Sequence, residues 1–267
     1  QLPIPAAPAP SNLNFSHESK REELEREITK ETAELSPEVR HSSLVAAKLL
    51  PRAYLENLVE IMELSGKQGW PVAPKVIFDS NGYWADEVFK VYTAQKVADG
   101  AKLVIGQHGG MMGASLLHSQ QTHQIEISDR FLSWGWEIHG EKKVSPVGVL
   151  KRQPKSNPSS RGPAVMPLLS LPKYPYDNCS FPIGQHGWLR YFEDQTSFLK
   201  SLNTLGQTDI VLRNYAKDRG NFLRERLEGL GWKTISAGNR PLSLDLPKYR
   251  MAIVTYNSTT LIETLGI

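Results

Sequence analysis

The sequence has little of several residue types and patterns, and each shortage excludes a class of protein. A single cysteine, Cys179, excludes an internal disulfide and a cysteine-based zinc site, which suits a reducing cytosol. No apolar run approaches the roughly 20 residues of a membrane-spanning helix, and no signal peptide is recognisable. The net charge of +3 comes without a block of Lys and Arg, so we predict no nucleic-acid partner. We expect a cytoplasmic protein.

Common catalytic motifs are missing as well. The sequence has no P-loop and no G-x-G-x-x-G fingerprint for a dinucleotide. It has no G-x-S-x-G elbow of a hydrolase and no Asp-x-Asp pair after a strand, which a metal-dependent glycosyltransferase usually needs. His118 and His123 lie five residues apart without a neighbouring cysteine or tight acidic set. We therefore predict neither a metal site nor a cofactor.

The 267 residues provide enough chain for one large or two ordinary domains. The chain starts at Gln1 without a methionine, and it stops at Ile267 just as a strand–loop–helix unit begins, so we expect a fragment of a longer protein. Residues 1–49 are predicted to be an N-terminal extension with helices. It has a Pro- and Ala-rich lead-in at 1–13 and a charged helix from Ser19 to about Leu35, which Ser36-Pro37 interrupts.

The residues that follow predict a first α/β domain at 50–150. Helical spacing runs from Leu55 to Met62. A strand, a helix and a strand then follow within about 30 residues, which is a βαβ unit with parallel strands. Two further strands are expected. The βαβ unit consists of a strand at 75–78, a helix at 84–97 and a strand at 103–105, and the two further strands are 125–134 and 144–150.

Residues 151–163 are polar with several prolines and are the best candidate for a linker. Beyond them the alternation of strands and helices restarts, which predicts a second domain at 164–267. Its expected strands are 165–169, 210–213, 233–236 and 251–255, and its helices are 189–202 and 221–230. The fold class predicted is α/β, with two Rossmann-like domains that face a cleft.

A glycine-rich segment, Gly106-Gln107-His108-Gly109-Gly110, directly follows a predicted buried strand. Open parallel sheets bind ligands beyond the carboxyl ends of their strands. Glycines there allow the backbone to approach a ligand closely, and the histidine can donate to a phosphate or act as a base. The alternative is a glycine turn whose histidine caps a neighbouring carbonyl.

A second segment, Thr255-Tyr256-Asn257-Ser258-Thr259-Thr260, lies between a strand and a helix. Free N–H groups at a helix start favour anions, and the hydroxyls add donors, so the segment could bind a diphosphate. Glu263, one turn later, could bind ribose hydroxyls. Thr260 and Glu263 also fit a capping box, which would make Glu263 structural.

The remaining candidates are weaker. Arg213, at the end of a predicted strand, could hold a phosphate or a sugar carboxylate, or could pair with Asp218 at the surface. Arg219 is a weaker candidate than Arg213. Asn81 follows the first strand of the βαβ unit and should face the same cleft, although a simple helix cap by Ser80 or Asn81 fits equally. A second Gly-Gln-His-Gly segment at 184–187 makes His186 a candidate of low rank.

Several segments taken in order resemble one family. They are LPRAYLENL (50–58), FDSNGYWADEVFKVYTAQK (78–96), LVIGQHGG (103–110), ISDRFLSWGW (127–136), VSPVGVLK (144–151) and YNSTTLIETL (256–265). The set is similar to transferases of spirochaete-type bacterial O-antigen loci and, more distantly, to capsule-type Kdo transferases with two Rossmann-like domains. This likeness implies a GT-B-like arrangement of the two domains. The resemblance implies that His108 and its glycines face a cleft from the first domain. It also implies that Ser258, Thr259 and Glu263 hold a nucleotide from the second.

We therefore expect a metal-independent glycosyltransferase that acts in surface-polysaccharide biosynthesis, in the cytoplasm or at the inner face of the membrane. His108 is the expected catalytic residue. Gln107, Gly109, Gly110, Asn81, Arg213, Asn257, Ser258, Thr259, Thr260 and Glu263 are expected to bind substrate or nucleotide. The partners are a nucleotide-sugar donor and a glycan or lipid-linked acceptor. The alternatives are a nucleotide-sugar epimerase or hydrolase of the same fold, and a non-catalytic scaffold of polysaccharide assembly.

Overall fold

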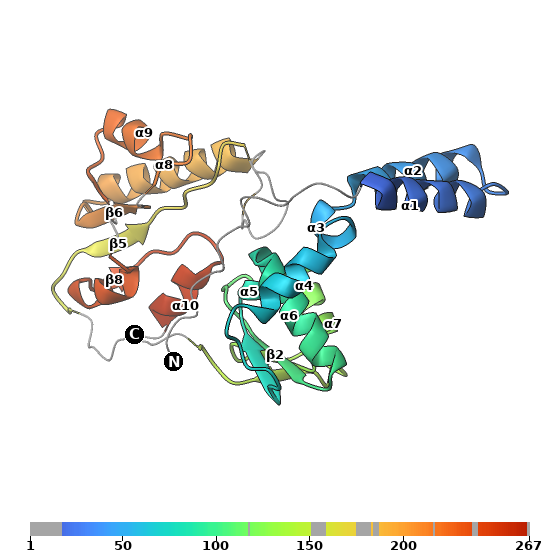
Figure 1. Ribbon diagram of the computed structural model, residues 1–267. Coiled ribbons are helices and arrows are strands. Elements are labelled where there is room, and N and C mark those ends of the chain that lie inside the picture. The colour runs from blue at the N-terminus through green and yellow to red at the C-terminus, as the bar shows by residue number, and fades with distance from the viewer. Residues whose placement is uncertain are drawn as a thin grey trace. The chain divides into compact units, whose positions relative to one another are not determined.

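The computed structural model describes residues 18–116, 118–150, 159–174, 183, 187–215, 217–236 and 240–265. Within these residues the chain is α/β, with ten α-helices and two parallel four-stranded sheets (Figure 1). It divides into two compact units, residues 1–105 and 106–267. Several features that the sequence singles out lie outside the described residues: the lead-in at 1–13, most of the linker (151–158), Cys179 and His186.

The helices and strands up to the first sheet's last strand follow in chain order. They are α1 (Glu18–Glu31), α2 (Pro37–Leu49), α3 (Arg52–Leu55), α4 (Leu58–Gly66), β1 (Val76–Asp79), α5 (Gly82–Ala85), α6 (Glu87–Ala98), β2 (Lys102–Gly106), α7 (Ser119–Ile127), β3 (Arg130–Ser133) and β4 (Val144–Pro146). The first sheet has the strand order β1-β2-β3-β4.

The elements of the second sheet follow from residue 164. They are β5 (Ala164–Pro167), α8 (Trp188–Thr204), β6 (Ile210–Asn214), α9 (Leu223–Gly229), β7 (Thr234–Ser236), the 3-10 helices η2 (Leu242–Leu244) and η3 (Leu246–Lys248), β8 (Met251–Ala252) and α10 (Thr259–Leu265). The strand order is β7-β6-β5-β8.

Two antiparallel helices, α1 and α2, begin the described chain (Figure 1). Ser36 begins α2 because its Oγ accepts a hydrogen bond from the backbone N–H of Val39, and Pro37 suits a first helical turn. Arg21 on α1 donates to the carbonyl of Ala47 and to the carboxylate of Glu56, with distances of 2.5 and 2.6 Å. Ser36-Pro37 thus separates the two helices of the N-terminal extension, although bounds were predicted from the sequence for the first of them alone.

The predicted βαβ unit is confirmed as β1, α6 and β2. The two strands pair in parallel, with Val76 opposite Lys102. Asp86 caps α6 by accepting from the N–H of Phe89, and the helix ends at Asp99 before Gly100, whose φ is +100°. Buried residues of α4 and α6 pack together, so this helix pair has its own apolar core: Ile61, Val88 and Val91.

One predicted strand is partly wrong. The pattern Ile125 to Trp134 suggested a single strand, but Ile125 and Ile127 belong to the last turn of α7, and β3 covers only Arg130–Ser133. The spacing of the buried residues Gln120, Gln124 and Ile125 is helical. Because two of these three residues are polar, the hydrophobic pattern of the sequence did not reveal the helix.

The strand β5 of the second sheet is buried on both faces, as strands of parallel sheets usually are. Neighbouring residues of β5 point to opposite sides. Met166 packs with Leu199 of α8 and Leu227 of α9, whereas Val165 packs with Leu242 and Leu246 of η2 and η3, as well as with Tyr249. Each of the fully buried side chains contributes about 1.5–3 kcal/mol to folding. This packing fixes the strands and therefore the positions at which the loops at their ends begin.

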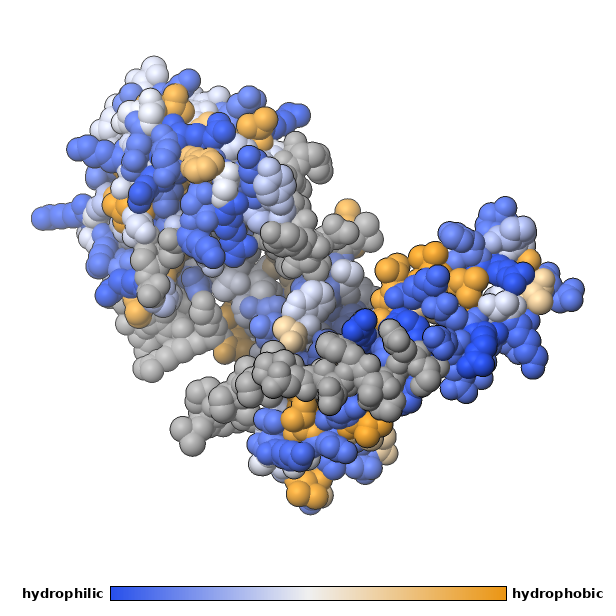
Figure 2. All heavy atoms as spheres, turned by 45° about the horizontal axis from the view of Figure 1, so that its top comes forward, coloured by the Kyte–Doolittle hydropathy of each residue, from blue (hydrophilic) through white to orange (hydrophobic). Residues whose placement is uncertain are grey.

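Hydrophilic side chains cover most of the visible surface, and hydrophobic ones form a band along the α1–α2 pair (Figure 2). Exposed apolar residues of this pair and its flanks are Leu35, Val39, Val45, Leu49 and Leu50. Among the helices of the described residues, none has the length and apolar character to cross a bilayer.

Candidate functional site

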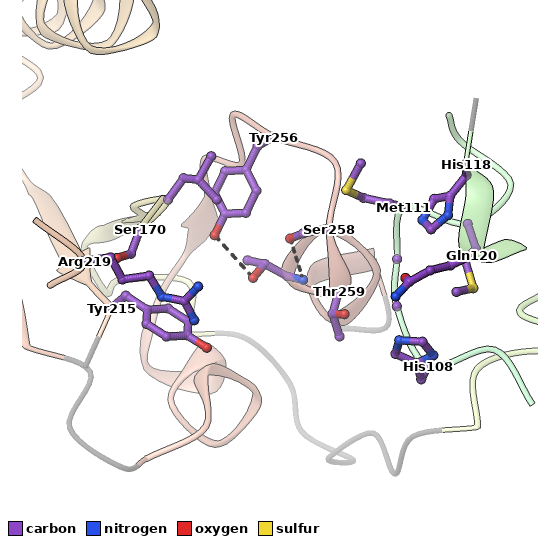
Figure 3. Close-up of a pocket in the computed structure, with 15 residues that line it drawn as sticks. His108, Met111, His118, Gln120, Ser170, Tyr215, Arg219, Tyr256, Ser258 and Thr259 are labelled. Carbon is purple, nitrogen blue, oxygen red and sulfur yellow. Dashed lines mark hydrogen bonds between the residues drawn. The ribbon is translucent and has the colours of Figure 1, made fainter. Parts of the chain in front are cut away.

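A hollow of about 290 Å³ lies within the second unit, at loops that follow β2, β5, β6 and β8 (Figure 3). Parallel sheets place their ligand sites at such carboxyl ends. We refer to two groups of lining residues by name. The histidine wall consists of His108, Gly109, Gly110, Met111, Met112, His118 and Gln120, and the hydroxyl wall consists of Leu169, Ser170, Tyr215, Arg219, Tyr256, Ser258, Thr259 and Thr260.

Gln107 holds the loop of the histidine wall in place. Its side chain is 3% exposed. Its Oε1 accepts from the backbone N–H of Trp134 and from the indole N–H of Trp136, each at 2.8 Å. Its Nε2 donates to the carbonyls of Gly109 at 2.7 Å and Met112 at 3.3 Å. The amide therefore has no hydrogen-bonding capacity left for a ligand. Gln107 lines no part of the pocket, and it connects the Gly-Gln-His-Gly-Gly segment to the Trp-Gly-Trp segment.

Two glycines of this loop are required by close packing. A Cβ added to Gly110 would lie 2.3 Å from the backbone carbonyl carbon of Ser258, so only glycine allows the two walls to meet there. At Gly113, which has a φ of +81°, an added Cβ would lie 2.5 Å from Nε1 of Trp136. At Gly109, by contrast, an added Cβ meets nothing within 4 Å. The glycines were expected to allow a close approach of the backbone to a ligand. In the structure, the close approach is between Gly110 and the backbone of Ser258.

The turn before α10 is fixed at both of its ends. At its start, Oγ1 of Thr255 lies 2.6 Å from the hydroxyl of Tyr191 and accepts from Nε2 of Gln195 at 3.0 Å. Burial raises the pKa of Tyr191 to about 12, so its hydroxyl stays protonated at neutral pH. At its end, Oγ of Ser258 accepts from the N–H of Thr260 at 3.0 Å. Ser258 thus caps the N–H of Thr260.

Tyr256 lies over this turn, on the hydroxyl wall. Its hydroxyl donates to Oγ1 of Thr260 at 3.5 Å (Figure 3). Burial raises the pKa of Tyr256, which keeps the phenol neutral. The hydroxyls of Tyr256, Ser258, Thr259 and Thr260 therefore form one uncharged group of donors and acceptors beside the hollow.

A guanidinium completes the hydroxyl wall. Arg219 is exposed and lines the pocket, and its Cζ lies 5.9 Å from the ring centre of Tyr215. Ser170 lies next to this pair (Figure 3). From the sequence, Arg219 ranked low and nothing pointed to Tyr215 or Ser170, and Tyr256 was named only as part of the 255–260 segment. Their positions just after β6, β8 and β5 are the signal that could have found them.

Arg213, which the sequence favoured over Arg219, is not in the pocket. It is 8% exposed at the end of β6. Its guanidinium donates to the carbonyl of Arg240 at 2.6 Å and lies 3.5 Å from the carboxylate of Asp245. The alternative surface pair with Asp218 is wrong, because Asp218 instead accepts from the N–H of Gly220. Arg213 therefore makes contacts inside the second sheet's own unit.

Three other named residues lie outside the lining. Asn81 is exposed, and it is the carboxylate of Asp79 that accepts from the N–H groups of 81–83 at the start of α5. Asn257 is exposed and does not line the hollow. Glu263 is 6% exposed inside α10. The structure thus unites His108, Gly109, Gly110, Ser258, Thr259 and Thr260 among the expected residues.

His118 is a second histidine of the pocket. It precedes α7, and its Nδ1 accepts from the backbone N–H of Gln121 at 3.3 Å. Burial lowers the pKa of His118 from its usual value. Its neighbour on the wall, Gln120, is 5% exposed. Across the residues that the structure describes, no three His, Cys, Asp or Glu side chains gather as a metal site would require.

The architecture is that of an α/β protein with two parallel sheets and a pocket at loops that follow the carboxyl ends of their strands. The chain belongs to the LIC12162 family of transferases, whose sequence pattern it matches over residues 4–267. This membership confirms the expected transferase class. Searches of curated proteins and of solved structures return no match.

Proposed function

We propose that this chain transfers a sugar from a nucleotide-sugar donor to a hydroxyl of a growing glycan or lipid-linked acceptor, in the synthesis of a bacterial surface polysaccharide. The proposal takes its two α/β halves as Rossmann-like domains of the GT-B kind. The observation that carries it is the pocket itself, which combines an imidazole at His108 with the hydroxyls of Ser258 to Thr260 and the guanidinium of Arg219.

The hydroxyl wall suits the leaving nucleotide. When the bond from the sugar's anomeric carbon to the phosphate oxygen breaks, negative charge develops on the phosphate. Arg219 can bind two phosphate oxygens through its planar guanidinium, and the hydroxyls of Ser258, Thr259 and Thr260 offer further donors. These groups supply positive charge and hydrogen bonds without a metal ion. Tyr215, 59% exposed, offers an aromatic face to the nucleoside.

The histidine wall suits the acceptor. As the acceptor oxygen attacks the anomeric carbon, its hydroxyl proton must leave, and the imidazole of His108 is the proposed base. A positioned base of this kind contributes about 100- to 10,000-fold to the rate. We assign no ligand contact to Gln107, Asn81, Arg213, Asn257 or Glu263, because none of them lines the pocket.

A panel of CMP-, UDP- and GDP-sugars tests the proposal. Calorimetry with the protein identifies the bound donors, and nucleotide release is then measured with and without an oligosaccharide acceptor. We expect at least one donor to bind and its release to depend on the acceptor. Absence of binding would favour a scaffold. Release without an acceptor would favour a hydrolase, and a changed sugar without release would favour an epimerase.

A further inference from the structure

His118 lines the pocket, yet the proposed transfer gives it no task. Its Nδ1 accepts the N–H of Gln121 in the first turn of α7. A ring nitrogen that accepts a hydrogen bond carries no proton of its own, so the proton of the neutral imidazole lies on Nε2. The backbone of α7 therefore selects one tautomer of this side chain.

Two further effects keep the ring neutral. Burial lowers the pKa of His118. The nine-residue helix α7 directs its positive end at the ring, which disfavours a second proton. At neutral pH the ring is thus an uncharged donor whose Nδ1 is already occupied. A neutral histidine held at a helix N-terminus can polarise a substrate oxygen by donating from Nε2.

The position of the ring fits that task. His118 lies on the same side of the pocket as His108, Met111 and Gln120, while Arg219 and Tyr215 lie on the other (Figure 3). Because Nδ1 binds α7, only Nε2 can serve a ligand in the hollow. The other titratable or charged groups of the pocket are His108, Tyr215, Arg219 and Tyr256, and α7 itself adds His123 and Glu126.

We infer that His118 is a neutral hydrogen-bond donor whose Nε2–H binds an oxygen of the transferred sugar beside His108. This inference rests on the proposed glycosyl transfer and adds a second catalytic residue to it. The two histidines then differ in role. His108 receives the acceptor's proton, whereas His118 keeps its own proton and holds the sugar in the reactive orientation by donating to one of its hydroxyl oxygens.

The matched variants are His118→Asn and His118→Ala. Asparagine is a strong N-cap and keeps an acceptor for the N–H of α7, but it has no atom in the place of Nε2. With the donor identified by the panel, we expect kcat of His118→Asn to fall about 10- to 100-fold at an unchanged Tm, because the sugar is no longer held in position. His118→Ala should lose the same activity and also lower the Tm. If His118→Asn keeps full kcat, the histidine only caps α7 and the inference fails.

A second readout needs no nucleotide sugar. Nitrogen-15 NMR of histidine-labelled protein at pH 7 distinguishes the two tautomers, and the signals absent from His118→Asn belong to His118. We expect a protonated Nε2 and a bare Nδ1. A protonated Nδ1 or a doubly protonated ring would overturn the inference. If no panel member is turned over, the proposed function fails along with the catalytic role, even where NMR finds this tautomer. If the protein transfers a sugar and His118→Asn is fully active, the inference about His118 fails while the proposed function stands.

Discussion

The two walls of the pocket are built differently. The histidine wall is held by hydrogen bonds of Gln107 and by glycine packing, and its two imidazoles are groups suited to proton chemistry. The hydroxyl wall is held by Tyr191 and Gln195, and it presents a guanidinium with several neutral hydroxyls. Under the proposed function the two walls have different tasks, the histidine wall proton transfer and the hydroxyl wall the binding of an anionic group.

The contact between the walls should be the most sensitive point. Gly110→Ala places a Cβ 2.3 Å from the Ser258 backbone, so the loop or the turn must move. A displacement of about 1 Å can cost on the order of 100-fold in rate, and we expect a loss of at least that size in kcat/KM.

Gly109→Ala is the matched control, because its Cβ meets nothing within 4 Å. Turnover of the panel's best donor by both variants is the measurement. Comparable activities for the two alanine variants would show that the walls do not depend on this close approach.

The next largest effect concerns the frame of the histidine wall. Gln107→Leu removes both acceptor and donor functions and leaves the indole N–H of Trp136 and a backbone N–H unsatisfied. Each buried unsatisfied group costs about 1–3 kcal/mol, so the free energy of unfolding should fall by about 2–4 kcal/mol. Urea denaturation measures this change, with the exposed Gln207→Leu as control. Equal stability of the two variants would disprove the role given to Gln107.

Two arginines test the hydroxyl wall. Arg219 belongs to it and should affect donor binding, whereas Arg213 lies outside it and should affect stability. Arg219→Ala should weaken donor binding about tenfold, because one charge-assisted phosphate contact is lost, and should leave the free energy of unfolding unchanged. Arg213→Ala should leave binding unchanged but lower the free energy of unfolding by about 1–3 kcal/mol, since the carbonyl of Arg240 loses its donor. Calorimetry and urea denaturation of both variants give the four numbers. If Arg213→Ala weakened binding more than Arg219→Ala did, the two assignments would have to be exchanged.

The smallest effect is a pH dependence of stability. Because the pKa of His118 is lower in the folded protein, the unfolded chain binds more protons at mildly acidic pH. The contribution of His118 is complete above its unfolded pKa of about 6.5 and is lost as the pH falls toward the folded pKa. Wild type should therefore lose more stability than His118→Asn between pH 7.5 and 5.5 in urea denaturation. Identical losses would mean that the ring titrates normally.

Much of the fold could be predicted from the sequence, because parallel strands are short apolar runs between helical segments. The strands β1 and β2, on either side of α6, follow this rule. The helix α7 was not predicted, because its buried face includes Gln120 and Gln124, and polar residues at these positions look like surface residues in a hydrophobic pattern. The helix α2 begins at Ser36-Pro37, which suggests a break but equally marks a helix start.

The site was only partly predictable for a related reason. The sequence shows which residues follow strands, and this found His108 and Ser258 to Thr260. It does not show which polar side chains already have hydrogen-bond partners inside the protein. The amide of Gln107 and the guanidinium of Arg213 have internal partners 27 and 32 residues away, whereas Arg219 lies on an exposed loop. Only tertiary structure separates these cases.

The account's central claim is that the two walls have separate tasks, and one paired measurement tests it most directly. The Kd and kcat of the panel's best nucleotide sugar are determined for His108→Ala and Arg219→Ala. We predict that His108→Ala binds the donor with an unchanged Kd but loses at least about 100-fold in kcat. Arg219→Ala should show a raised Kd. A His108→Ala protein with full kcat, or the same pattern in both variants, would contradict the account.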